Sequence, residues 1–126
     1  MTICVVDDEP PIMQLCVKVL ETHGHVVDGY TRGDEVLARL EAAPADLLVV
    51  DYRMPGLNGL ELVRRARRLR PGIRVVMITG HGTPEVVHAA EAAGVDGVLL
   101  KPFTPSELAG AVARALRPSP GPRAAG

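Results

Sequence analysis

The chain has 126 residues, a length that suits one domain with a real hydrophobic core and is too short for two. Hydrophobic residues make up 47% of the chain and charged residues 23%, ordinary values for a soluble globular protein. The formal net charge of −1 gives no reason to expect nucleic-acid binding through the whole surface, and no apolar stretch approaches the ~20 residues of a membrane span.

Strand and helix patterns alternate five times along the chain, beginning with an apolar run at the N-terminus that has no secretion signal before it. In chain order the predicted elements are strand Ile3–Val6, helix Pro11–His23, strand His25–Tyr30, helix Gly33–Ala42, strand Leu47–Val50, a helix capped by Asn58, strand Arg74–Ile78, a helix from Thr83 to about Ala93, strand Val98–Leu100 and a helix that begins at Thr104. Because we find neither a secretion signal before the first strand nor an apolar stretch long enough to span a membrane, we expect a cytoplasmic protein.

Apolar residues at helical spacing predict which side of each helix is buried. In the first helix the predicted stripe is Ile12, Leu15, Cys16, Val19 and Leu20. Cys16 and Cys4, which lies in the first strand, are interpreted as small core residues in a reducing compartment.

Capping residues predict where two of the later helices begin. Asn58 is followed three residues later by Glu61, and Thr104 by Glu107, the spacing of a capping box. Gly110, inside the last helix, costs roughly 1 kcal/mol relative to Ala, so we expect that helix to be among the softer ones.

The composition changes at the C-terminal end of the chain. Residues 118–126, PSPGPRAAG, predict a flexible tail or the start of a linker, because this composition forms neither a helix nor a packed core. Residues 1–117 are predicted to form the single folded domain.

Five strand–helix units with short connections predict an α/β fold, a doubly wound parallel sheet with helices on both faces. On open sheets of this type ligands bind beyond the carboxyl ends of the strands, where the strand order reverses. The residues found where the apolar runs end are Asp7, Asp8, Asp51, Thr79 and Lys101. We expect three carboxylates, a hydroxyl and an ammonium in one crevice.

The three carboxylates predict a divalent cation. Two unit charges ~5 Å apart repel by roughly 3 kcal/mol at an effective dielectric constant of ~20, so three acids at one edge need a cation or a raised pKa. Mg²⁺ prefers oxygen ligands and uses one or two carboxylates, and the absence of Cys or His from this motif argues against zinc.

Asp51, at the end of the central apolar strand, is the candidate nucleophile because an aspartate carboxylate can take up a phosphoryl group as an acyl phosphate. Mg²⁺ and Lys101 would supply positive charge to the phosphoryl oxygens, and the hydroxyl of Thr79 could donate to them. Lys101 precedes Pro102, and a cis bond there would aim the lysine inward; that isomer is a hypothesis.

These residues carry a resemblance to a known family. The segments that match are VVDDEP at 5–10, VVDYRMPGLNGLEL at 49–62, VVMITGHG at 75–82 and LLKPF at 99–103. In order and spacing they resemble the receiver domain of two-component response regulators, the phospho-acceptor half of bacterial phosphorelays. The resemblance implies a flavodoxin-like three-layer fold with strand order 2-1-3-4-5.

The resemblance also implies a role for each site residue. Asp8 and Asp51 would ligate Mg²⁺ directly, Asp7 would do so through water, and the main-chain carbonyl of Arg53 would add a ligand. Asp51 would receive phosphate from the histidine of a partner kinase or a phosphotransfer protein, in a reaction the domain itself catalyses.

In the same family Lys101 would pair with the phosphoryl group, and Thr79 would move to hydrogen-bond it and so alter the face formed by the fourth helix, fifth strand and fifth helix. The output would be a downstream domain or protein, and we expect no direct nucleic-acid or membrane contact. The sequence departs from the family at Val98, where an aromatic residue usually swings inward. Either the face responds through Thr79 and the backbone alone, or signalling uses another surface.

Two further features invite a functional interpretation. The arginines Arg64, Arg65, Arg67, Arg68 and Arg70 are interpreted as a solvated helix face, with contact to an acidic partner as the alternative. His81 is interpreted as an exposed loop residue, although it could influence attack of water on the acyl phosphate.

Two other classes of function are weighed against the leading one. A phosphatase with an aspartyl nucleophile generally has an acid two residues after that nucleophile, where this chain has Arg53, a side chain that cannot donate a proton usefully at neutral pH. A flavin-binding electron carrier of the same topology needs phosphate-binding donors after the first strand, where Asp7, Asp8 and Glu9 would repel a phosphate.

Overall fold

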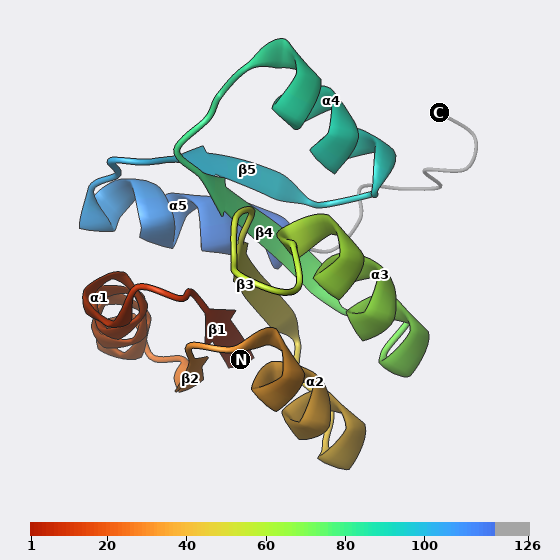
Figure 1. Cartoon of the computed structure of the whole chain (residues 1–126). Helices are drawn as coiled ribbons and strands as arrows, with labels where there is room; N and C mark the ends of the chain where they lie inside the picture. Colours follow the sequence, from red (N-terminus) through yellow and green to blue (C-terminus); the bar gives the residue numbers. More distant parts are fainter. Residues whose placement is uncertain (118–126) are drawn as a thin grey trace.

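The protein, seen in a computed structural model that describes residues 1–117, is built on one five-stranded parallel sheet (Figure 1). The strands are β1 (Thr2–Val6), β2 (Val26–Tyr30), β3 (Leu47–Asp51), β4 (Arg74–Thr79) and β5 (Gly97–Leu100). Their order is β2-β1-β3-β4-β5, and all neighbours run parallel. The predicted fold class and strand order are confirmed, whereas the predicted tail at 118–126 lies outside the described residues.

Helices cover both faces of this sheet. They are α1 (Pro10–Thr22), α2 (Gly33–Ala42), α3 (Gly59–Leu69), α4 (Pro84–Ala92) and α5 (Pro105–Ala115). α1 and α5 pack on one face, and α2, α3 and α4 on the other (Figure 1), which gives two cores separated by the sheet. All five residues of β3 are buried because this central strand is covered on both sides.

Cys4 and Cys16 are free thiols, and their full burial in these two cores confirms that they are core residues. Within the described residues, each helix is too short or too polar to cross a membrane.

The helix ends follow the sequence signals with one exception. Gly24 and Gly94 end α1 and α4 with φ of 89° and 77°, a conformation that glycine adopts without strain. Thr104 and Glu107 form both halves of the predicted capping box. At α3 the Asn58 side chain accepts a hydrogen bond from the Glu61 amide at 2.9 Å, but the reciprocal bond is absent because the Glu61 carboxylate binds arginines one turn farther on.

The predicted stripe of α1 is wrong at Leu15, whose side chain is exposed. Cys16, Val19 and Leu20 make the buried contact with the sheet, and Leu15 lies at the margin of that contact, beside Pro105 of α5. The buried stripe of α1 is therefore narrower than the apolar pattern suggested.

The interpretation of the α3 arginines as a solvated face is wrong for two of them. The guanidinium of Arg67 donates to the carbonyl of Ile73 at 3.1 Å, and that of Arg70 donates to the carbonyl of Leu40 at 2.8 Å. The other three arginines of the run are exposed. Arg67 and Arg70 reach backbone acceptors because the C-terminal end of α3 lies close to the C-terminal end of α2 and to the loop before β4.

Candidate functional site

The polar residues predicted to converge do meet at the carboxyl edge of the sheet. Asp51 and Thr79 are the last residues of β3 and β4, while Asp7 and Lys101 follow β1 and β5 directly. The Lys101–Pro102 peptide bond is cis, as hypothesised. Because β1, β3 and β4 are neighbours in a parallel sheet, residues distant in sequence lie side by side at one edge.

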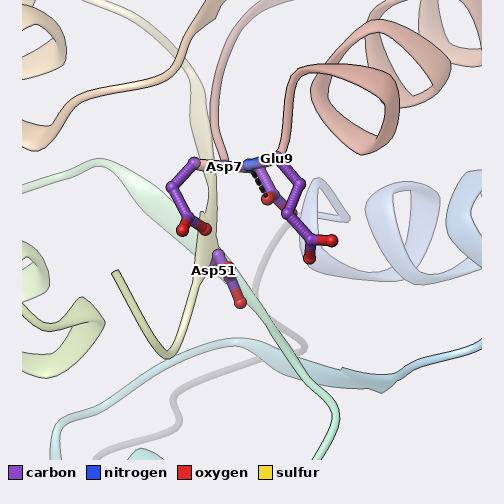
Figure 2. A group of neighbouring side chains, drawn as sticks. Asp7, Glu9 and Asp51 are labelled. Carbon is purple, nitrogen blue, oxygen red and sulfur yellow. Dashed lines mark hydrogen bonds between the residues drawn. The ribbon is translucent and has the colours of Figure 1, made fainter. Parts of the chain in front are cut away.

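Four acidic side chains gather there. Asp7, Asp8, Glu9 and Asp51 each offer a carboxylate oxygen, and these oxygens lie within 4.8 Å of one another. Figure 2 shows the side chains of Asp7, Glu9 and Asp51 brought together from the ends of β1 and β3. Asp7 and Asp51 are only 1% and 5% exposed, whereas Glu9 is exposed and Asp8 is half-buried.

Lys101 provides the positive charge of the site. Its Nζ lies 3.2 Å from Glu9 Oε1, 3.4 Å from Asp7 Oδ2 and 3.5 Å from Asp51 Oδ1. Only the contact with Glu9 is also a hydrogen bond. One ammonium therefore faces three carboxylates, and the site keeps an excess of negative charge.

Burial, and after it the neighbouring charges, shift the pKa values of Asp51, Asp7 and Lys101. Burial, and next the charge of Asp7, raise the pKa of Asp51 to about 7 against an opposing effect of Lys101. Burial also raises the pKa of Asp7, although the Glu9 amide donates to its Oδ1 at 2.9 Å. For Lys101 burial disfavours the ammonium, but the charges of Asp7 and Asp51 outweigh it and raise the pKa.

The donor set fits a hard divalent cation. Within residues 1–117, Asp7 Oδ2 is a buried oxygen without a hydrogen-bond donor, since its contact with Lys101 at 3.4 Å is a charge contact only. The surrounding ligand atoms are carboxylate oxygens, which Mg²⁺ prefers. A cation here would compensate the repulsion and satisfy that oxygen.

Thr79 is 1% exposed, and its hydroxyl is engaged by its own loop. The amide of His81 donates to Thr79 Oγ1 at 3.0 Å. The side chain of His81 is exposed, in agreement with its interpretation as a loop residue. The Thr79 hydroxyl itself donates to the His81 carbonyl at 3.4 Å, and it would have to leave that acceptor before it could donate to a ligand in the site.

A cleft of about 260 Å³ opens over these groups. Its lining residues are Asp8, Glu9, Asp51, Arg53, Thr79, Gly80, His81 and Lys101. A larger hollow of about 630 Å³ lies on the other side of Asp8, between the loops after β2 and β3, but Asp51, Thr79 and Lys101 do not line it. The smaller cleft is the one lined by the predicted site residues Asp8, Asp51, Thr79 and Lys101.

Backbone packing after β3 fixes the position of Asp51. The Tyr52 amide donates to the Ile78 carbonyl at 2.8 Å, and the Gly59 amide donates to the Tyr52 carbonyl at 2.9 Å. A Cβ at Gly59 would lie 2.6 Å from the Asp51 carbonyl oxygen, so only glycine lets α3 start this close to the strand. The loop thus holds the Asp51 backbone between β4 and α3.

Sequence reasoning missed Glu9 and Gly59 as site residues. Glu9 continues the acidic run after β1, and that adjacency was a signal that it could join the cluster. Gly59 follows the cap residue Asn58, but its contact with Asp51 depends on how α3 packs and left no signal in the sequence.

Comparisons with known proteins agree on one family. The family profile described as "Response regulator receiver domain" matches residues 3–113. The chain is 38% identical over 118 residues to the phosphate regulon transcriptional regulatory protein PhoB of Rhizobium meliloti, an alignment that covers 91% of this chain and 52% of that protein. The chain thus spans about half the length of the curated relatives it matches.

Solved structures give the same result. A CheY-like response regulator receiver domain protein from Methanospirillum hungatei JF-1 superposes with a TM-score of 0.85 at 31% identity, covering 91% of this chain and 92% of that one. The BeF3-activated DrrB receiver domain superposes with a TM-score of 0.84 at 29% identity, covering 91% of this chain and 96% of that one. The acidic cluster at the carboxyl edge is typical of the metal site of such domains.

Proposed function

The chain belongs to the response regulator receiver family, whose members are phospho-acceptor signalling modules, and we propose that Asp51 is the residue that takes up the phosphoryl group. One observation carries this proposal. The nearly buried carboxylate of Asp51 ends the central strand 3.5 Å from the Lys101 ammonium, and both line a cleft that is open to solvent. A nucleophile, a cation and access for a donor are thus combined in one place.

We propose that the cluster binds Mg²⁺. Asp8 and Asp51 would ligate it directly, Asp7 through a water molecule, and the main-chain carbonyl of Arg53 would complete the protein ligands. The bound ion would neutralise charge on the phosphoryl oxygens. The unpaired oxygen of Asp7 and the excess negative charge support this assignment.

The transfer needs few groups from the protein. An oxygen of Asp51 attacks phosphorus, the bond from phosphorus to the donor histidine nitrogen breaks, and that nitrogen keeps the electron pair. Lys101 pairs with the phosphoryl oxygens, and the Thr79 hydroxyl leaves the His81 carbonyl to donate to them. Water later attacks phosphorus, which frees inorganic phosphate and regenerates the carboxylate.

The partners we propose are a histidine kinase or phosphotransfer protein as donor and a downstream domain or protein as receiver of the signal. Val98 is half-buried in β5 and packs against the core on the α4 side, with no ring to swing. The output face formed by α4, β5 and α5 would therefore respond through Thr79 and the backbone alone, or another surface would carry the signal.

Beryllofluoride tests the proposal, because its beryllium and fluorines stand in for phosphorus and the phosphoryl oxygens. With Mg²⁺ present, it should shift the NMR signals of Asp51, Thr79 and Lys101, and Asp51→Asn should abolish these shifts. Asp34→Asn removes an equal charge from an exposed residue outside the cleft and should leave them intact. A wild-type spectrum that ignores beryllofluoride at saturating Mg²⁺ would contradict the proposal.

The same protein sample distinguishes this function from a phosphatase. Arg53, two residues after Asp51, is exposed and lines the cleft, and it offers no proton to a leaving group at neutral pH. We expect a single phosphorylation per chain with a phosphohistidine donor and no sustained turnover of a phosphomonoester.

A further inference from the structure

Glu9 has a contact that the proposed reaction does not use. Its carboxylate is the only partner of Lys101 within the site that makes a hydrogen bond, at 3.2 Å. The Glu9 side chain is 60% exposed, whereas those of Asp7 and Asp51 are 2% and 6% exposed. The lysine is thus drawn toward the mouth of the cleft by its most accessible neighbour.

The backbone of Glu9 is fixed while its side chain is free to leave. Its amide donates to Asp7 Oδ1 at 2.9 Å, and its carbonyl accepts the first bonds of α1, from Ile12 and Met13. No side-chain cap bond from Glu9 to α1 is formed. Among the polar contacts within residues 1–117, turning the carboxylate away therefore breaks only the one with Lys101.

A phosphoryl group on Asp51 would bring oxygens that need the same ammonium. The Lys101 ammonium lies 3.5 Å from Asp51 Oδ1, so oxygens of a phosphoryl group on Asp51 would come within its reach while it is hydrogen-bonded outward to Glu9. Turning the ammonium inward to those oxygens would weaken its hydrogen bond with Glu9. The two anions therefore compete for one cation.

We propose that Glu9 is a positioning residue that holds the Lys101 ammonium at the mouth of the cleft and competes with the phosphoryl oxygens for it. This inference rests on the proposed function. Glu9 lowers the affinity of the site for a phosphoryl group, and its removal frees Lys101 for the inner position.

An effect of Glu9 through the metal is the alternative that the experiment must separate. The carboxylate of Glu9 belongs to the acidic cluster, so removing its charge could weaken binding of Mg²⁺. The two effects have opposite signs, because weaker Mg²⁺ binding disfavours the phosphoryl group whereas release of Lys101 favours it.

The experiment measures beryllofluoride affinity at saturating Mg²⁺, after titration of Mg²⁺ alone, by NMR on the whole chain. Glu9→Gln should tighten beryllofluoride binding about two- to five-fold, the range expected for an exposed ion pair. Glu9→Asp keeps the charge on a shorter side chain, and its affinity for beryllofluoride should lie between those of the wild type and Glu9→Gln. Glu21→Gln, which removes an exposed charge at the far end of α1, is the matched control and should equal the wild type.

A second signal reports on the lysine directly. Without any ligand, the Hε–Cε signal of Lys101 should shift in Glu9→Gln and stay unchanged in Glu21→Gln. If Glu9→Gln binds beryllofluoride equally or more weakly at saturating Mg²⁺, or leaves the lysine signal unmoved, the competition is refuted. If the wild type itself binds no beryllofluoride, the proposed function falls and the role of Glu9 falls with it.

Discussion

At the carboxyl edge of the sheet one ammonium contacts three carboxylates of a four-acid cluster, whereas at the opposite, amino edge arginines donate to backbone carbonyls at the ends of helices. There Arg74 reaches the carbonyls of Ala115 and Arg117 at 2.7 and 2.9 Å. Arg39 reaches that of Ala43 at 2.7 Å. These cations satisfy free carbonyls and oppose the negative ends of the helix dipoles.

This difference indicates that the charged residues of the amino edge serve stability, whereas those of the carboxyl edge serve function. At the amino edge the charges are partnered by the protein itself, and Asp96 likewise accepts from the Val75 amide at 2.8 Å and from Arg67 at 3.3 Å. At the carboxyl edge Lys101 offsets only part of the repulsion among the carboxylates, and the remaining repulsion opposes folding. Substitutions at the amino edge should therefore change stability and leave metal affinity alone, and those at the carboxyl edge should couple the two.

Gly59→Ala should have the largest effect. The new Cβ would lie 2.6 Å from the Asp51 carbonyl oxygen and 2.9 Å from Tyr52 Cα, and backbone atoms cannot yield as a flexible side chain does. We expect a loss of about 3 kcal/mol in the free energy of unfolding, measured in urea, together with weaker Mg²⁺ binding.

Gly72→Ala, in the turn before β4 at the amino edge, is the control for that substitution. A Cβ there would meet no atom within 4 Å, so stability and Mg²⁺ affinity should both stay close to wild type. Equal behaviour of the two variants would show that the start of α3 can relax, and would contradict the tight positioning of Asp51.

Arg70→Ala probes the amino edge. It removes donors to the carbonyls of Leu40 and Glu41, at 2.8 and 3.4 Å, and should cost about 1.5 kcal/mol in urea unfolding while Mg²⁺ affinity is unchanged. Arg68→Ala, two residues away and exposed, should change stability little. A change in Mg²⁺ affinity in Arg70→Ala would break the separation between the two edges.

Asp7→Asn should stabilise the metal-free protein, whereas the substitutions above should destabilise it or leave its stability unchanged. In EDTA it should raise the free energy of unfolding by about 1 kcal/mol, because it removes one of the clustered like charges. With Mg²⁺ added, the wild type should gain more stability than the variant, since the ion binds the folded state only. Urea titrations with and without Mg²⁺ give both numbers, and a variant less stable in EDTA would refute the account.

The pH dependence of the magnesium-free protein follows from the burial of Asp51 and, after it, from the same repulsion. Burial and Asp7 raise the pKa of Asp51 from 3.8 to about 7, so the folded state holds this proton more tightly than the unfolded state. The resulting stabilisation is complete below the pKa of Asp51 in the unfolded state, 3.8, and is lost as pH rises through its pKa in the folded state, about 7. Urea midpoints in EDTA should therefore fall across this window, less steeply in Asp7→Asn than in the wild type.

The sequence predicted the convergence at the carboxyl edge because the geometry of a parallel sheet alone brings strand ends together. Asp51 and Thr79 needed only a correct strand assignment. The cis bond before Pro102 was hypothesised because a cis peptide bond costs least before proline. The identity of the sheet order came from the family resemblance.

The amino edge was less predictable because its bonds depend on how helices pack. Arg67 and Arg70 carry the same charge and spacing as their exposed neighbours, so periodicity could not distinguish them from a solvated face. The exposure of Leu15 and the orientation of the Glu61 side chain likewise depend on neighbours that the local pattern does not contain.

Gly110→Ala should have the smallest effect. It tests whether a change in stability far from both edges of the sheet leaves Mg²⁺ affinity unchanged. Gly110 lies inside α5, and its Cβ would meet only the end of the flexible Arg114 side chain, at 3.3 Å. We expect a gain of about 0.7 kcal/mol in urea unfolding, since alanine restricts the unfolded chain and favours the helix. Mg²⁺ affinity should match the wild type, because neither edge of the sheet is touched. A gain in stability accompanied by altered Mg²⁺ binding would mean that the site responds to the stability of the whole fold rather than to its own charges.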